Sequence, residues 1–130
     1  MQYYCPACGK RQETIVVRKK ETYPVRGEPI TIIANVCTCA CCGEEIMTIE
    51  CDDENLRRAY AKYRAKHGFL QPKEIKALRQ RLGVSAEEFA KMTHVDCDSI
   101  LRYERGSLQT AADNQAFLWV ERCAYPDRNH

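Results

Sequence analysis

The chain has 130 residues, 45% of them apolar, with a single tryptophan. This length allows one compact domain or two small domains and excludes a large catalytic architecture. Twenty lysines and arginines against eighteen aspartates and glutamates leave a formal charge of +2, so neither a polybasic arm nor an acidic tail explains function, and any binding to nucleic acid depends on local placement of charge.

The first 51 residues combine β-branched runs with turn residues, which is typical of short strands. Residues 14–18 and 30–36 predict two strands, and Pro24, Gly27 and Pro29 predict a break between them. A further short strand is predicted over residues 46–49. Together these runs predict a small antiparallel sheet.

From residue 52 the apolar residues change to helical spacing. Leu56, Ala59, Tyr60 and Tyr63 fall at i, i+3, i+4 and i+7, which predicts a connecting helix over residues 52–67. Basic residues outnumber acids five to three in this helix, so nearly all of the formal excess charge lies on it.

The segment from residue 71 onward predicts several short helices with clear ends. Pro72 is placed as a first helical residue and Gly83 as the stop of that helix. Ser85 and Glu88 form a capping box that opens a second helix, in which each side chain satisfies a backbone donor of the other residue. The expected buried side chains of this second helix are Phe89, Ala90 and Met92.

Two more helices follow. The third is predicted over residues 96–104, with Asp96 as its N-cap, Ile100 and Tyr103 on its buried side, and a stop at Gly106. The last, over residues 111–124, carries the apolar run 117–120 and is expected to pack on the preceding helices or on another subunit.

Cysteine spacing points to a metal site. The chain has nine cysteines, an odd number, and six of them precede residue 43. The pattern C-x-x-C-G occurs twice, at residues 5–9 and 39–43, and its spacing lets both sulfurs of one knuckle reach an ion at about 2.3 Å. Two such knuckles predict a zinc ribbon with one structural Zn²⁺, whose ligands are Cys5, Cys8, Cys39 and Cys42.

The second pair requires a choice among four clustered cysteines. Only Cys39 with Cys42 has the two-residue spacing, and only Cys42 precedes a glycine, so Cys37 and Cys41 are expected to be spare thiols. Four thiolates close the coordination shell, which favours a structural ion over a catalytic one. The alternatives are a thioredoxin-type redox pair and a rubredoxin-like iron site, which uses the same ligands as zinc.

The helices between residues 72 and 106, with a short turn at His94 and Val95, resemble a helix-turn-helix of the Cro/repressor type. Residues 85–92 and 99–106 carry this resemblance, which leaves Arg102 facing outward to contact guanine or phosphate. Carboxylates at Asp96 and Asp98 oppose phosphate at the start of the third helix. The candidate DNA-contacting residues are Ser85, Asp98, Ser99, Arg102 and Arg105.

The combination of these features resembles the MqsA-like antitoxins with a YgiT-type zinc finger. Its specific parts are the two cysteine knuckles, the Cys42–Ile46 stretch, residues 54–64 and the Arg-Tyr-Glu-Arg-Gly run at 102–106. The resemblance implies that the ribbon contacts a cognate toxin protein. It also implies that the helix-turn-helix domain forms a homodimer and binds a palindromic operator in double-stranded DNA, with base-reading side chains at Asp98 and Arg102.

The expected fold class is therefore α+β. A β-rich Cys₄ zinc ribbon is expected over residues 1–51, a connecting helix and linker over 52–70, and an all-α helix-turn-helix bundle over 71–130. The expected function is a sequence-specific repressor that also serves as the antitoxin of a type II toxin–antitoxin pair. The alternative is an interaction module whose helix-turn-helix no longer reads DNA, because Ala86, Asp96 and Asp98 replace residues that favour DNA contact.

Several classes of function are not expected. The three histidines are scattered, and the sequence has neither a Ser/His/Asp set nor a phosphate-binding loop, so no enzyme activity is predicted. No apolar run reaches the roughly 18 residues of a membrane span, and the first residues lack the pattern of a signal peptide. We therefore expect a cytoplasmic protein that does not contact membranes.

Overall fold

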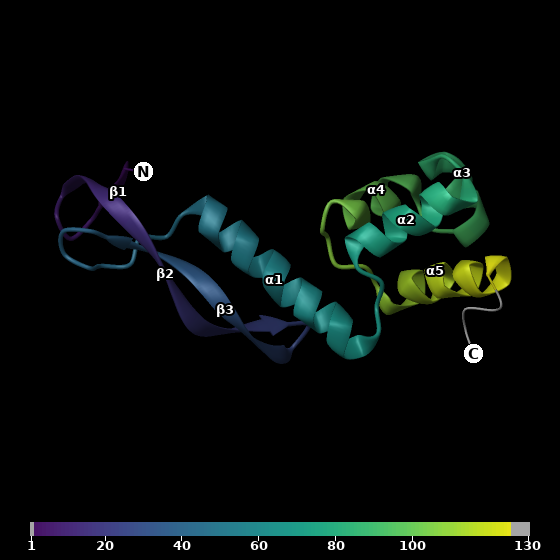
Figure 1. The fold of residues 1–130 in the computed structure, drawn as a ribbon, viewed down its shortest axis with the longest axis horizontal. Coiled ribbons are helices and arrows are strands. Elements are labelled where there is room, and N and C mark those ends of the chain that lie inside the picture. The colour runs from purple at the N-terminus through teal and green to yellow at the C-terminus, as the bar shows by residue number, and fades with distance from the viewer. Residues whose placement is uncertain (1, 126–130) are drawn as a thin grey trace. The chain divides into compact units, whose positions relative to one another are not determined.

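The computed structural model describes residues 2–125 (Figure 1) and confirms the α+β class. An antiparallel sheet in the order β1-β2-β3 precedes five helices. The strands are β1 (Gln2–Cys5), β2 (Lys10–Val25) and β3 (Glu28–Cys39). The helices are α1 (Ile49–His67), α2 (Pro72–Leu82), α3 (Ala86–Thr93), α4 (Cys97–Glu104) and α5 (Ala111–Ala124).

The chain divides into two compact units, and each is described by itself. Residues 1–63, the sheet unit, contain the three strands and most of α1. Residues 64–130, the helical unit, contain the end of α1 and the four remaining helices. No helix within residues 2–125 combines the length and apolar content that a membrane crossing requires.

The β2–β3 hairpin is longer than the sequence predicts, because its two prolines do not break it. Val25 pairs with Glu28 across a two-residue turn, so Pro24 and Pro29 form the next opposed pair. Hydrogen-bonded and non-bonded pairs alternate along an antiparallel ladder, and the pair next to the turn is bonded. The prolines therefore occupy a pair that needs no N–H. The break predicted at the two prolines was wrong for this reason, whereas the break predicted at Gly27 is confirmed by the turn.

The turn itself has a specific backbone conformation. Its two central residues, Arg26 and Gly27, have φ angles of 51° and 79°. Positive φ at both positions defines a type I′ turn, whose twist matches that of the flanking strands. Glycine adopts this conformation without steric cost, whereas Arg26 is one of two non-glycine residues with positive φ among the described residues.

The predicted strand over residues 46–49 was wrong. In this region Glu45 forms one isolated bridge with Thr38, and α1 already begins at Ile49. The hydroxyl of Thr48 accepts a hydrogen bond from the N–H of Cys51, so it acts as a helix cap. Capping by Thr48 therefore outweighs the β-propensity of the run and starts α1 three residues earlier than predicted.

Helix α1 lies along the outer edge of β3 and satisfies its backbone through side chains (Figure 1). Asn55 bonds both the N–H and the carbonyl of Asn35, Arg58 donates to the Ile33 carbonyl, and Lys62 donates to the Thr31 carbonyl. The three donors recur at helical spacing while their partners recur every second residue of the strand. An edge strand that would otherwise expose unpaired groups is thereby covered.

The helical unit confirms the predicted helix ends. Gly83 caps α2 in the left-handed region at φ 70°, and Ser85 and Glu88 form the capping box of α3. The carboxylate of Asp96 accepts from the N–H of Ser99 and caps α4. These ends were predictable because each rests on residues that are close in sequence.

The four helices of this unit share one apolar core. Met92 was expected to be buried but is 42% exposed, because the short α3 buries only the face that carries Phe89. In α5, Phe117 lies fully in the core whereas Trp119 is 62% exposed. The buried residues of the core are Leu70, Ile75, Leu78, Phe89, Val95, Ile100, Tyr103, Phe117 and Val120.

Candidate metal centre and helical interface

Two knuckles position the cysteines of the candidate metal centre. Cys5 ends β1 and Cys39 ends β3, so the ladder fixes the first cysteine of each knuckle. The N–H of Gly9 donates to the Cys5 carbonyl at 2.8 Å, and the N–H of Gly43 donates to the Cys39 carbonyl at 2.8 Å. Both glycines have positive φ, 73° and 77°, which the tight turns require. The two knuckles therefore share one local geometry.

The four predicted sulfur ligands come together in the structure. All lie within 4.8 Å of one another, with Cys5 and Cys42 sulfurs 3.5 Å apart and Cys8 and Cys39 sulfurs 3.9 Å apart. Four sulfurs at 2.3 Å from a tetrahedral ion are separated by about 3.8 Å. The cluster therefore has the dimensions needed to hold one metal ion.

The thiols of this cluster differ in acidity. The N–H of Cys42 bonds the Cys39 sulfur and is the largest of the effects that lower the pKa of Cys39 to about 7. The pKa of Cys8 is strongly raised, first by its hydrogen bond with Cys42 and then by burial. The N–H of Glu44 lowers the pKa of Cys42, but its hydrogen bond with Cys5 and its burial outweigh that effect and raise it. Cys39 is therefore the first of these three to ionise.

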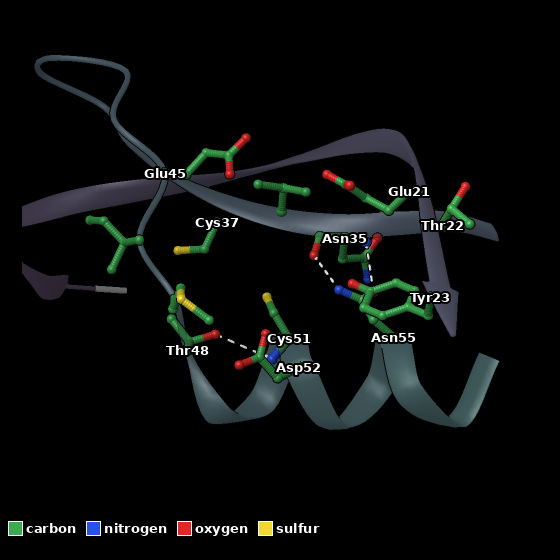
Figure 2. A pocket seen from close by; sticks show the side chains of 13 residues that line it. Glu21, Thr22, Tyr23, Asn35, Cys37, Glu45, Thr48, Cys51, Asp52 and Asn55 are labelled. Atoms are coloured by element: carbon green, nitrogen blue, oxygen red, sulfur yellow. Dashed lines mark hydrogen bonds between the residues drawn. The ribbon is translucent and has the colours of Figure 1, made fainter. Parts of the chain in front are cut away.

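The spare cysteines lie outside the four-sulfur cluster. Cys37 is buried on β3 and Cys41 is exposed in the second knuckle. The sheet unit has a cavity of about 220 Å³. Cys37 from β3 and Cys51 from α1 are among the residues that line it (Figure 2). The Asn35–Asn55 hydrogen bonds lie at one end of this cavity. The cavity is thus formed where α1 docks on the sheet.

The predicted DNA-contacting residues do not all lie on one surface. Asp98, Arg102 and Arg105 are exposed and recur at i, i+4 and i+7 from the start of α4, so they share one side of that helix and its end. Ser99 is half-buried and its hydroxyl accepts from Arg102 at 3.0 Å. Ser85 is exposed but its hydroxyl caps α3. The charged face of α4 is therefore formed by Asp98, Arg102 and Arg105.

An ion pair fixes α4 on α2. Two nitrogens of Arg79 donate to the two carboxylate oxygens of Glu104 at 2.9 Å each. The hydrogen bonds that Arg79 donates to Glu104 outweigh burial and raise the pKa of Arg79. Bidentate geometry defines orientation as well as distance. The ion pair therefore holds α4 against α2 at Glu104, which is two residues after Arg102.

Sequence analysis missed a buried arginine in the helical unit. Arg64 is 2% exposed and donates to the carbonyls of Gly106 and Ser107 and to the side chain of Gln109. The first two carbonyls follow the C-terminus of α4, where the helix dipole favours a cation. The sequence places Arg64 among the five basic residues of the connecting helix. Its position four residues after Tyr60, on the apolar side of that helix, is the signal that indicates burial.

The comparisons with known proteins fall into two parts. A family model described as the antitoxin component of the bacterial toxin–antitoxin system, MqsA, matches residues 3–121. Neither the curated proteins nor the solved structures contain a match to the chain. The matched segment includes the four clustered cysteines and reaches into α5.

Proposed function

The chain belongs to the family of MqsA antitoxin components, and from this membership we propose that it neutralises a cognate toxin and represses its own operon. The single observation that carries the antitoxin role is the family match, which extends over residues 3–121 and so includes both units. Repression rests on a separate argument from the charged face of α4. The two activities are therefore tested separately.

Zinc is the metal we propose for the four-cysteine cluster. Four sulfur ligands at tetrahedral spacing suit Zn²⁺ and fill its coordination shell, which leaves no position for a water ligand. The residues that hold it are Cys5, Cys8, Cys39 and Cys42. When bound, the ion supplies folding free energy to a unit whose apolar core is small.

The proposed DNA-binding element is the α3–turn–α4 segment. The exposed face of α4 carries Asp98, Arg102 and Arg105, and an arginine at such a position can bond two acceptors of guanine or a phosphate. Ser99 supports this arrangement because its hydroxyl accepts from Arg102. Ser85 contributes as a cap whose backbone lies at the start of α3.

A homodimer is part of this proposal, since operator palindromes mirror a two-fold axis of the protein. An apolar groove of about 390 Å³ supports it. The groove brings the exposed side chains of Met92 in α3 and Trp119 in α5 together. The remaining lining residues are Val120, Cys123 and Ala124.

The second candidate function is an interaction module that does not read DNA. Asp98 places an exposed carboxylate on the face of α4, where it repels phosphate. Zinc with four thiolates adds −2, which cancels the formal +2 of the chain and removes long-range attraction to DNA. Asp96 carries less weight in this argument, because its carboxylate caps α4 as the sequence predicts.

Two assays test the proposal. Co-expression with the toxin encoded beside it in the operon tests neutralisation, and restored growth is the expected result. Selection from random duplex DNA by the zinc-loaded protein at about 0.15 M salt tests repression, because nonspecific charge contacts are weakened there. A palindrome with half-sites about one helical turn apart is expected. Growth rescue without any enriched sequence would support the interaction module instead.

A further inference from the structure

The two long strands of the sheet differ in how their outer edges are covered. The outer edge of β3 is bonded by the side chains of α1, and its last part by the backbone of Glu44 and Ile46. Among residues 2–125, β1 is the strand that covers the outer edge of β2, and it pairs with residues 10–13. Beyond that point the edge of β2 has no neighbouring strand within the described part of the chain.

The register of the hairpin identifies the groups at this open edge. In an antiparallel pair of strands, two directly opposed residues either hydrogen-bond to each other or both point their N–H and carbonyl groups away from the partner strand. Side chains of α1 and the N–H of residue 46 bond backbone groups of β3 that point away from β2. The residues of β2 opposite them therefore also have their N–H and carbonyl groups pointing outward. These outward-facing residues of β2 are Val16, Arg18, Lys20 and Thr22.

The side chains along this edge form two adjoining groups. Ile15 and Val16 are 55% and 57% exposed, and Val17 is 38% exposed, so apolar surface is exposed on both faces of the strand. Arg18 and Lys20 follow, and neither forms an ion pair within residues 2–125. An apolar triplet therefore adjoins two uncompensated positive charges.

Resting on the proposed antitoxin function, we propose that an extended segment of the toxin adds to the sheet at the β2 edge, which we define as residues 15–22. Backbone hydrogen bonds to the outward-facing groups supply affinity in such strand addition, and side chains supply specificity. The toxin segment carries apolar residues against Ile15, Val16 and Val17 and acidic residues beside Arg18 and Lys20. The proposal makes the β2 edge the surface that recognises the toxin, and it predicts which side chains the bound toxin segment carries.

A second copy of this chain fits the same edge less well. Two identical antiparallel strands related by a two-fold axis near residue 19 place Arg18 and Lys20 near the same residues of the other copy. Like charges on opposed or diagonal positions destabilise strand pairing. A strand with acidic residues at these positions gains attraction where the second copy meets repulsion.

Proline substitution tests strand addition without disturbing β3. Pro24 already occupies an outward-facing position of β2, so the hairpin tolerates proline in this register. Arg18→Pro removes an outward N–H and also blocks close approach of a strand. Arg18→Ala is the matched control because it removes the same charge and keeps the N–H. Zinc content and circular dichroism verify that both variants fold.

The readout is affinity for the purified toxin that is encoded beside this chain. Wild type is expected to bind, and Arg18→Pro is expected to bind at least about tenfold more weakly than Arg18→Ala, from one lost hydrogen bond and the steric block. Lys20→Glu is also expected to weaken binding, and by a larger factor at low salt than at high salt, because it reverses a charge at the edge that salt screens.

Each contrary outcome has a distinct meaning. If Arg18→Pro and Arg18→Ala bind the toxin equally, strand addition is overturned while the antitoxin role stands. If wild type does not bind the toxin, the proposed function fails and the partner assigned to this edge is overturned with it. If the free wild-type chain dimerises and Arg18→Pro abolishes the dimer, the edge pairs with a second copy and the assignment to the toxin is wrong.

Discussion

The side chain of Asn55 on α1 reproduces the hydrogen bonding of a neighbouring strand toward Asn35 on β3. Its Oδ1 accepts from the N–H of Asn35 and its Nδ2 donates to the carbonyl of the same residue, both at 2.8 Å (Figure 2). A carboxamide matches a peptide group in having one acceptor and a donor in one plane. One buried side chain thus helps to anchor α1 to the sheet edge.

Replacing Asn55 tests this anchor. Asn55→Ala is expected to reduce the free energy of unfolding by about 1–3 kcal/mol, because it leaves a partly buried backbone donor and acceptor without partners. Asn55→Asp keeps the acceptor and loses the donor, so it should also destabilise. Urea denaturation monitored by circular dichroism measures both. Leu56→Ala is the control, since Leu56 is 40% exposed, and an equal loss in that variant would contradict the assigned role.

The metal centre offers two adjacent cysteines with different expected roles. Cys42→Ser removes a proposed ligand, whereas Cys41→Ser changes an exposed thiol one residue away. Cys42→Ser should lose stoichiometric zinc and become sensitive to proteolysis in the sheet unit, because the ion supplies folding free energy. Metal analysis and limited proteolysis measure this. Retention of zinc by Cys42→Ser with its loss in Cys41→Ser would reverse the ligand assignment.

The metal-free protein should have a characteristic dependence of stability on pH. The pKa of Cys39 is lowered to about 7 from the usual value of 9.0, so its contribution is complete above pH 9 and is lost as pH falls through about 7. The pKa values of Cys8 and Cys42 are raised, so their contributions are complete below pH 9 and are lost as pH rises further. Stability should therefore rise from pH 7 to 9 and then decline.

Denaturation in the presence of a chelator, repeated across this pH range, measures the profile. Cys39→Ser should abolish the rise between pH 7 and 9, since it removes the thiol whose pKa is lowered. The decline above pH 9 should persist in that variant. A rise that survives in Cys39→Ser would show that another group causes it.

Arg64 should contribute strongly to the helical unit. Arg64→Ala is expected to cost about 2–4 kcal/mol, because it removes the hydrogen bonds that Arg64 donates to the buried Gln109 side chain and to two carbonyls after α4. Arg64→Lys should recover only part of this loss, since one ammonium does not reproduce the planar guanidinium. Thermal unfolding provides the measurement. Arg122→Ala, an exposed change on α5, serves as the control and should have little effect.

Arg102 should determine DNA affinity. Arg102→Ala is expected to cost about 1–3 kcal/mol in binding if the side chain reads a base, and to lower the salt dependence if it contacts phosphate. Electrophoretic mobility shifts with the selected operator at several salt concentrations distinguish these two results. Lys91→Ala on α3 is a matched loss of exposed charge. Unchanged specific binding by Arg102→Ala would remove the role assigned to this residue.

The sequence by itself determined the features that depend on neighbouring residues. The C-x-x-C-G spacing was sufficient to predict the two cysteines of each knuckle, because a knuckle is formed within five residues, whereas strand pairing brings the two knuckles together. The caps at Ser85 and Asp96 and the stop at Gly83 were likewise predictable, since each satisfies backbone groups within one helical turn. Local hydrogen bonding therefore determined the helix ends and the shape of each cysteine knuckle.

Only the tertiary structure decided how residues distant in sequence satisfy one another. The length of the β2–β3 hairpin followed from the pairing of Pro24 with Pro29 at a register that needs no donors. The burial of Arg64 depended on carbonyls more than forty residues away. In the same way, Asn55 covers the edge of β3 while the edge of β2 stays open, because hydrogen-bond partners across a fold are set by packing and leave no periodic signal in the chain.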